Sequence, residues 1–317
     1  MRFARPCCSS CSAPSPNRSP VRVERVHFPS AGATLVGDLH LPTSSTGPVA
    51  AVVVGGAWRT VKEQMATGYA RERAARGFAS LAFDYRGWGE SGGRPRSMED
   101  SMAKAEDIVA AAAYLASRAD VADVHALGVC ASGAYTATAA TQTCDIASVA
   151  LVAPALPSRA TVQAQLGGRP GIEALTRSAR AAAERYEKTG RELLLPAVER
   201  NPLTTAPGAD YYTSPERGAV PQWDNTFNPA SWTHWLDYDA QAAAPLLTQP
   251  LLVVHSDAAA SPESVREFVA LVPGRVEQLW LSDVSQFDFY DAREPMTAAA
   301  DAVAAHVGAH RRALRRS

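Results

Sequence analysis

The 317-residue chain has no excess of charge of either sign, with 31 Lys and Arg against 32 Asp and Glu and a formal net charge of -1. A near-neutral chain offers no electrostatic basis for binding nucleic acid or an acidic membrane surface, so we expect neither partner. The one basic cluster, Arg311, Arg312, Arg315 and Arg316, is predicted to lie in the last turn of a helix, where cations suit the helix dipole.

Long apolar runs are also missing. No stretch approaches the roughly 18 to 20 residues that a membrane-spanning helix needs. Residues 1–20 are rich in Ser, Pro and Cys and contain no apolar segment, so they do not resemble a secretory signal peptide. We interpret them either as a disordered tail or as a stretch upstream of the natural start.

Cysteine is scarce, and three of the five cysteines, Cys7, Cys8 and Cys11, fall in this tail. An odd count with such a distribution does not form a disulfide framework, which favours a reducing, cytoplasmic setting. The tail cysteines have no neighbouring histidine or second cysteine pair, and we expect no metal site and no cofactor. Cys144 also lacks a functional context and is interpreted as structural.

What the chain does contain is a regular alternation of strand and helix patterns. Alternating apolar residues at 23–28 and 34–41 flank a turn and predict a β-hairpin. Buried strands are predicted at 49–54, 79–83, 124–129, 146–152, 251–255 and 277–281, and helices at 63–76, 98–119, 132–141, 262–271 and 296–312. This order is typical of an α/β fold with a mostly parallel, doubly wound sheet.

The alternation stops between Pro157 and Trp235, where no strand-like run appears and 172–188 has helical spacing. A stretch of this length is more often a cap than a loop. We therefore predict three parts: a tail at 1–20, an α/β core at 21–156 and 236–317, and a helical cap insertion at 157–235.

A sharp strand-to-helix turn is predicted at Gly128-Val129-Cys130-Ala131-Ser132-Gly133. An exposed nucleophile on such a turn needs small residues two positions before and after it. Cys130 has Gly128 and Ser132 there, whereas a turn centred on Ser132 would make the preceding strand two residues too long. The sequence thus favours Cys130 as the nucleophile, and the alternative is that Cys130 is only a small buried residue.

The expected surroundings of Cys130 suit acyl chemistry. A thiol at a helix N-terminus meets free amides and the helix dipole, which lower its pKa. The amide of Ala131 would stabilise an oxyanion, and Gly56 and Ala57, after the 49–54 strand, are expected to supply the second donor unless this segment is an ordinary turn.

These motifs resemble the dienelactone-hydrolase-like branch of the α/β-hydrolases, which includes YcjY-type bacterial proteins and the fungal polyketide transferases. The similar strings are Leu-Val-Gly-Asp-Leu-His-Leu-Pro at 35–42, Val-Lys-Glu-Gln-Met at 61–65, Phe-Asp-Tyr-Arg-Gly at 83–87, Gly-Val-Cys-Ala-Ser at 128–132 and Phe-Asp-Phe-Tyr-Asp at 287–291. The resemblance covers most of the chain from Val21 onward. It implies an α/β-hydrolase fold and reactions of esters, lactones or thioesters.

The sequence departs from this family at two positions. Gln286 occupies the position of the catalytic histidine, and an amide does not accept a proton near neutral pH. Ala259 falls where the catalytic acid would lie, and Asp257 and Asp288 are the carboxylates close to these positions. No Cys-His-Asp triad is therefore readable.

Other histidines are candidates for the base, namely His255 at a strand end and His234 in the predicted cap. We interpret His306 and His310 on the last helix as solvated. Asp288 is expected either to orient an acceptor or to cap its own turn.

Aromatic residues are concentrated in the predicted loops and cap, where they would form an apolar pocket. The residues predicted to contact substrate are Trp58, Ser132, His234, Trp235, Phe287 and Tyr290, and Trp88, Tyr211, Tyr212, Trp223 and Trp232 belong to the same aromatic set.

Three functional hypotheses follow. The first is an acyl hydrolase, acyltransferase or cyclase that acts through Cys130 on an apolar, polyketide-like small molecule. The second is a non-covalent cyclase or lyase, or a catalytically degenerate small-molecule binder, because the usual histidine is Gln286. The third is a dehydratase or lyase with Asp257 or Asp288 as base. The sequence allows a homodimer.

Overall fold

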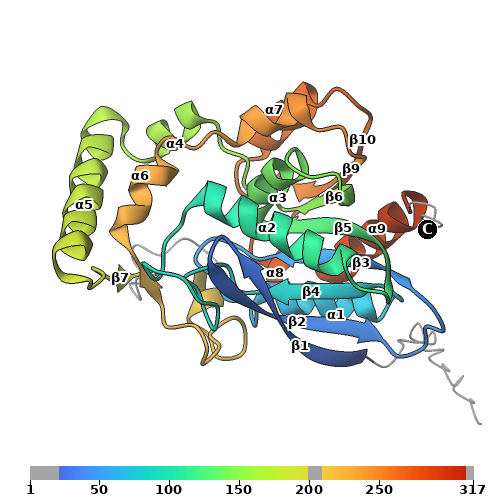
Figure 1. Cartoon of the computed structure of the whole chain (residues 1–317). Helices are drawn as coiled ribbons and strands as arrows, with labels where there is room; N and C mark the ends of the chain where they lie inside the picture. Colours follow the sequence, from blue (N-terminus) through green and yellow to red (C-terminus); the bar gives the residue numbers. More distant parts are fainter. Residues whose placement is uncertain (1–20, 199–208, 312–317) are drawn as a thin grey trace, which may run out of the picture.

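A computed structural model describes residues 21–198 and 209–311. Within these ranges, one eight-stranded sheet forms the centre of the molecule, in the order β1-β2-β4-β3-β5-β6-β9-β10 (Figure 1). Its strands are β1 (Val21–Ser30), β2 (Ala33–Pro42), β3 (Val49–Gly55), β4 (Ala79–Phe83), β5 (Val121–Val129), β6 (Ile146–Val152), β9 (Leu251–Ser256) and β10 (Val276–Leu281). The predicted hairpin is confirmed as β1 and β2, which pair antiparallel at one edge, and the remaining strands run parallel.

Helices cover both faces of the sheet, and the predicted doubly wound α/β fold is confirmed. On one face pack α2 (Ser101–Ala116), α3 (Ser132–Ala140) and α7 (Pro262–Leu271), and on the other α1 (Met65–Ala74) and α9 (Arg293–Ala309). In β3, Ala51 and Val53 join the first layer of core, while Val52 and Val54 join the second. A strand buried on both faces needs apolar residues at every position, which explains the continuous run at 49–54.

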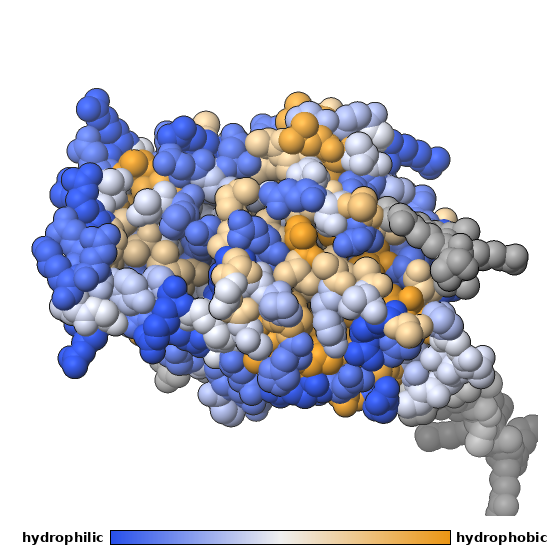
Figure 2. Space-filling model, in the orientation of Figure 1, coloured by the Kyte–Doolittle hydropathy of each residue, from blue (hydrophilic) through white to orange (hydrophobic). Residues whose placement is uncertain are grey.

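The segment predicted as the cap lies outside the sheet. It contains α4 (Arg159–Gln165), α5 (Gly168–Thr189), η1 (Ala209–Tyr212), η2 (Pro229–Ser231) and α6 (Trp232–Trp235), and η3 (Ala240–Leu246) leads from it to β9. One correction is needed, because two residues each of β7 (Leu195–Pro196) and β8 (Thr226–Phe227) pair antiparallel. The outlying α5 is mostly exposed, and Figure 2 shows a mainly hydrophilic surface at its end of the molecule.

The ends of the chain differ from the predictions. Helix α9 ends at Ala309, so Arg311 lies beyond its last turn, because the helix is shorter than its pattern indicated. The tail 1–20 and the arginines after position 311 lie outside the described residues. In the part of the chain that is described, no helix is long and apolar enough to cross a bilayer, and Cys130 and Cys144 form no disulfide.

Candidate active site

The turn between β5 and α3 is centred on Cys130, as predicted. Cys130 has φ = +56°, a left-handed backbone conformation that is uncommon for residues other than glycine. Its amide donates to the carbonyl of Val152 (3.1 Å), and its carbonyl accepts from the amides of Gly133 and Ala155 (2.9 Å each). Main-chain hydrogen bonds therefore hold a strained residue in place, as is common at functional turns.

The small residues beside the turn are a steric necessity. A Cβ atom added at Gly128 would lie 2.3 Å from the carbonyl oxygen of Ser132, and one at Gly133 would lie 2.5 Å from Cβ of Pro154. Ser132 itself is fully buried. Its hydroxyl donates to the carbonyl of Gly56 and lies 2.8 Å from the Tyr85 hydroxyl. This hydroxyl therefore joins the turn to the loop after β3, and its contact with substrate stays a prediction.

Four groups face the sulfur of Cys130: the amides of Ala131 and Trp58, the hydroxyl of Tyr290 and the side-chain amide of Gln286. Each of them favours the thiolate. Burial nevertheless dominates and raises the pKa of the Cys130 thiol above its ordinary value. This corrects the expected lowered pKa, because loss of hydration costs the thiolate more than these donors return.

The amide that accompanies Ala131 is that of Trp58 rather than those of Gly56 or Ala57. The amide of Ala57 is 3.4 Å from the sulfur of Met65, and the carbonyl of Gly56 accepts from Ser132. The amide of Ala57 is thus directed elsewhere, and the next amide along the loop, that of Trp58, meets the sulfur. The sequence predicted that this loop supplies the second amide, but it assigned Trp58 only a substrate contact through its aromatic side chain.

Gln286 is held in one orientation. Its Nε2 donates to the carbonyl of Ala153 (2.9 Å) and to the hydroxyl of Tyr290 (3.1 Å), and its Oε1 accepts from the amide of Ala260 (3.1 Å). Ala259, at the position of the family's acid, is a buried methyl group. Since neither side chain exchanges protons, the site beside Cys130 contains a hydrogen-bond donor where a base is usual.

The two carboxylates proposed as catalytic lie elsewhere. Asp257 has 73% of its side chain exposed and forms an ion pair with Arg266. Asp288 accepts from the amide (2.9 Å) and the hydroxyl (2.6 Å) of Ser285, which caps the turn before α8 (Asp288–Asp291). One carboxylate thus faces solvent and the other is used locally, which does not favour the catalytic roles predicted for them.

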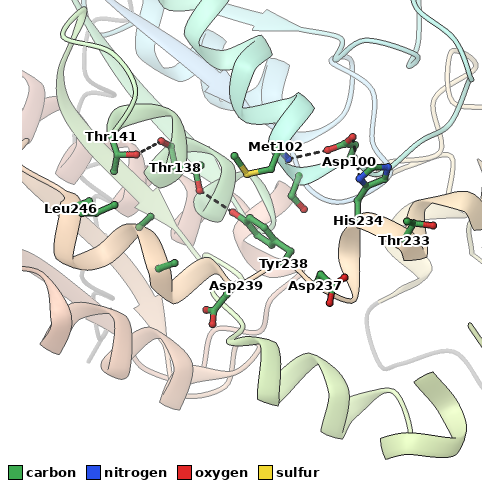
Figure 3. Close-up of a pocket in the computed structure, with 13 residues that line it drawn as sticks. Asp100, Met102, Thr138, Thr141, Thr233, His234, Asp237, Tyr238, Asp239 and Leu246 are labelled. Atoms are coloured by element: carbon green, nitrogen blue, oxygen red, sulfur yellow. Dashed lines mark hydrogen bonds and ion pairs between the residues drawn. The ribbon is translucent and has the colours of Figure 1, made fainter. Parts of the chain in front are cut away.

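The candidate histidine bases are also placed away from the sulfur. His255 is buried edge-on against Trp280 (5.2 Å between ring centroids), and burial lowers its pKa to about 4. His234 is half-exposed, with Nδ1 3.5 Å from a carboxylate oxygen of Asp100. Figure 3 shows this pair on the wall of a surface cleft of about 500 Å³ that also includes Tyr238. The contacts of these two histidines are thus with Trp280 and Asp100.

Aromatic rings from the loops and the cap segment surround the site. Phe287 packs against Tyr290 and Tyr212, with ring centroids 5.5 and 6.1 Å apart, and Trp58 stacks on Trp235 at 5.2 Å. Tyr212 belongs to the aromatic set predicted to form the pocket, although it was not among the residues predicted to contact substrate. Trp88 is a core residue instead, buried with its indole N–H bonded to the carbonyl of Met98.

Comparisons with known proteins agree with this architecture. The model of the "Alpha/beta hydrolase family" matches residues 47–309. The uncharacterized protein PA2218 of Pseudomonas aeruginosa is 29% identical over 280 residues, which is 82% of this chain and 73% of that protein. The crystal structure of PA2218 superposes with a TM-score of 0.81 over 93% of this chain and 96% of that chain.

Two further matches are shorter or more distant. The uncharacterized protein YcjY of Escherichia coli is 43% identical over 94 residues, 29% of this chain and 31% of that protein. The alpha/beta hydrolase GrgF from Penicillium sp. sh18 superposes with a TM-score of 0.77 at 21% identity, covering 92% of this chain and 99% of that chain. At this identity, the likeness to GrgF describes the fold alone.

Proposed function

The chain belongs to the alpha/beta hydrolase family, and from this premise we propose that it transfers an acyl group from an ester, lactone or thioester through Cys130. The observation that carries the proposal is the setting of the Cys130 sulfur, which meets two main-chain amides on a strained turn while Gln286 replaces the base. The arrangement retains the parts that form an acyl-enzyme and lacks the part that activates water.

The first step is the acylation of Cys130 by the acyl donor. The carbonyl oxygen points to the amides of Ala131 and Trp58, and the sulfur of Cys130 attacks the carbonyl carbon. A carbon–sulfur bond forms as the bond to the leaving group breaks. The Tyr290 hydroxyl, which faces the sulfur, accepts the thiol proton and passes its own proton to the departing alcohol or thiol. This relay suits a thiol that is protonated at rest.

The second step favours an acceptor other than water. A general base contributes typically 10²–10⁴-fold to such a step, and Gln286 cannot provide it. An amine is nucleophilic without a base, and a hydroxyl of the same acyl chain gains from proximity. The aromatic rings of Trp58, Tyr212 and Phe287 suit an apolar, polyketide-like acyl chain and would limit water. Transfer or cyclisation is thus favoured over hydrolysis.

Acyl trapping tests the proposal. The full-length protein is incubated with a simple acyl thioester or a β-lactone and examined by intact-mass spectrometry and peptide mapping. We expect one acyl group on Cys130 in the wild-type chain and in Cys144→Ser, and none in Cys130→Ala. Acylation confined to Cys144 or to the tail cysteines would contradict the proposal.

A second candidate is a non-covalent binder or cyclase, which the raised pKa of Cys130 and the missing base favour. The variant Cys130→Ala separates the two mechanisms, because it removes the sulfur and keeps the small size that the turn requires. Once a substrate is in hand, unchanged turnover in Cys130→Ala would establish the non-covalent mechanism. Loss of turnover with intact ligand binding would support the acyl-enzyme.

A further inference from the structure

Two imidazoles and a carboxylate meet at the edge of the sheet opposite Cys130. Glu277 is the second residue of β10, and His306 and His310 lie one turn apart near the end of α9. Cys130 follows the carboxyl end of β5, whereas Glu277 lies at the amino end of a parallel strand. The cluster therefore does not belong to the candidate active site, and it contradicts the interpretation of His306 as solvated, because that residue is buried.

The three side chains converge on one carboxylate oxygen. Oε1 of Glu277 lies 3.1 Å from Nδ1 of His306 and 3.0 Å from Nε2 of His310. All three potential ligand atoms lie within 4.8 Å of one another. The spacing of four residues places both imidazoles on the same helix face.

This donor set suits a transition-metal ion. Imidazole nitrogen and carboxylate oxygen bind Zn²⁺ at about 2.0–2.2 Å, commonly as three protein ligands with a fourth position for water. Tetrahedral bonds of that length separate neighbouring donors by about 3.3 Å, so the two distances from Glu277 need to widen by only a few tenths of an ångström, and the two imidazole nitrogens lie within 4.8 Å of one another. We propose that Glu277, His306 and His310 form a binding site for a divalent transition-metal ion, foremost Zn²⁺.

A second group of possible metal ligands differs from the Glu277 site in already containing a cationic side chain. Glu63, Asp84 and Glu90 also lie close together, but the ammonium group of the buried Lys62 contacts all three carboxylates. Among the described residues, no lysine or arginine forms an ion pair with Glu277, whose ion-pair partners are the two histidines. Glu277 and His310 are partly exposed, with 42% and 31% of their side chains accessible, which gives an ion a route to the site.

The expected role is to tie the last helix to the edge strand. A bound ion would join α9 to β10, and binding to the folded state alone raises stability in proportion to the logarithm of the free metal concentration. The sequence carried no sign of this site, since Glu277 and the histidines are about 30 residues apart and only the path from β10 through α9 brings them together.

Cobalt substitution tests the site. The full-length chain, with Cys7, Cys8 and Cys11 changed to serine so that tail thiols cannot bind metal, is stripped with a chelator and titrated with Co²⁺. We expect visible d–d absorption that saturates at one equivalent and is displaced by Zn²⁺, with a rise in melting temperature. His310→Ala and Glu277→Gln should each weaken binding by more than about 100-fold, above the loss typical of outer-shell partners.

A matched control is His27→Ala, which removes a histidine on β1 and should leave the titration unchanged. His310 is partly exposed and Gln replaces Glu277 isosterically, so both variants are expected to fold, and circular dichroism checks this. Absence of Co²⁺ absorption in the parent chain, or equal absorption in His310→Ala, would overturn the proposal and leave a hydrogen-bonded cluster.

Discussion

The loop after β5 and the loops after β9 and β10 lie at the same edge of the sheet, yet they differ in what they retain. The first has the geometry of a nucleophile turn. Cys130 has a positive φ, and there is no space for a Cβ atom at Gly128 or Gly133. The other two have Ala259 and Gln286 where the resemblance predicts the family's acid and base. The side-chain amide of Gln286 is hydrogen-bonded to the main chain at Ala153 and Ala260.

This difference teaches that the position of a nucleophile and its activation are separate properties. The conformation of the turn depends on the packing and hydrogen bonds of several residues at once, so a single substitution elsewhere in the site does not remove it. The base depends on one side chain, and its replacement leaves the fold intact. Four experiments, ordered by the size of the expected effect, would sharpen or break this comparison.

The largest change should follow from restoring the base and acid together. In the double variant Gln286→His and Ala259→Asp, the new imidazole would lie beside the sulfur of Cys130. The new carboxylate would lie beside that imidazole, because the amide of the neighbouring Ala260 already contacts Gln286 (3.1 Å). We expect release of the acyl group to water to accelerate by about 100-fold or more. Deacylation of the trapped enzyme, followed by mass spectrometry, measures this.

The single variant Ala259→Asp is the control and should show no gain, because no imidazole is present for the carboxylate to orient. If the double variant acylates normally but deacylates no faster, the turn and the loops are not arranged for joint action, and the comparison fails.

The next effect concerns the turn itself. Gly128→Ala places a methyl group 2.3 Å from a carbonyl oxygen of Ser132, a main-chain atom that cannot move aside cheaply. We expect a loss of about 3 kcal/mol in the free energy of unfolding, measured by urea denaturation. Gly47→Ala, with nothing within 4 Å of the added atom, should be nearly neutral. Equal stability of both variants would show that the turn tolerates bulk.

A smaller effect should follow from removing the hydroxyl at position 290. Tyr290→Phe keeps the ring contacts with Tyr211 and Phe287 but deletes the group that faces the sulfur. We expect the acylation rate to fall by about 10-fold, because the proton relay is lost. Tyr211→Phe changes a neighbouring ring that does not face Cys130 and should acylate at the wild-type rate.

The smallest effect is in pH dependence. Burial raises the pKa of the Cys130 thiol, so the neutral thiol predominates at pH 7 and the thiolate fraction keeps growing as the pH rises above about 8.5, the ordinary value for cysteine. Site-resolved alkylation with iodoacetamide should therefore be several-fold slower at pH 7 than for free cysteine and still be rising at pH 9. A plateau below pH 8 would instead indicate a thiolate stabilised by the helix N-terminus.

The sheet was largely predictable because its strands carry their environment in local patterns. The run at 49–54 is apolar at every position because β3 is buried on both faces, and the hairpin alternates because β1 is exposed on one. Helix α9 was placed less accurately, since helix ends depend on capping and fraying as much as on periodicity.

The sequence by itself determined the turn at Cys130, and its resemblance to the family predicted that Gln286 stands where the catalytic histidine is usual. Both are written in a few adjacent residues, because the turn requires glycine at fixed offsets and the base is a single side chain. Only the tertiary structure decided that the Trp58 amide meets the sulfur, that burial raises the pKa of Cys130, and that His306 is buried beside Glu277. These properties arise from residues distant in the chain, and their energies depend on how completely the fold removes water from between them.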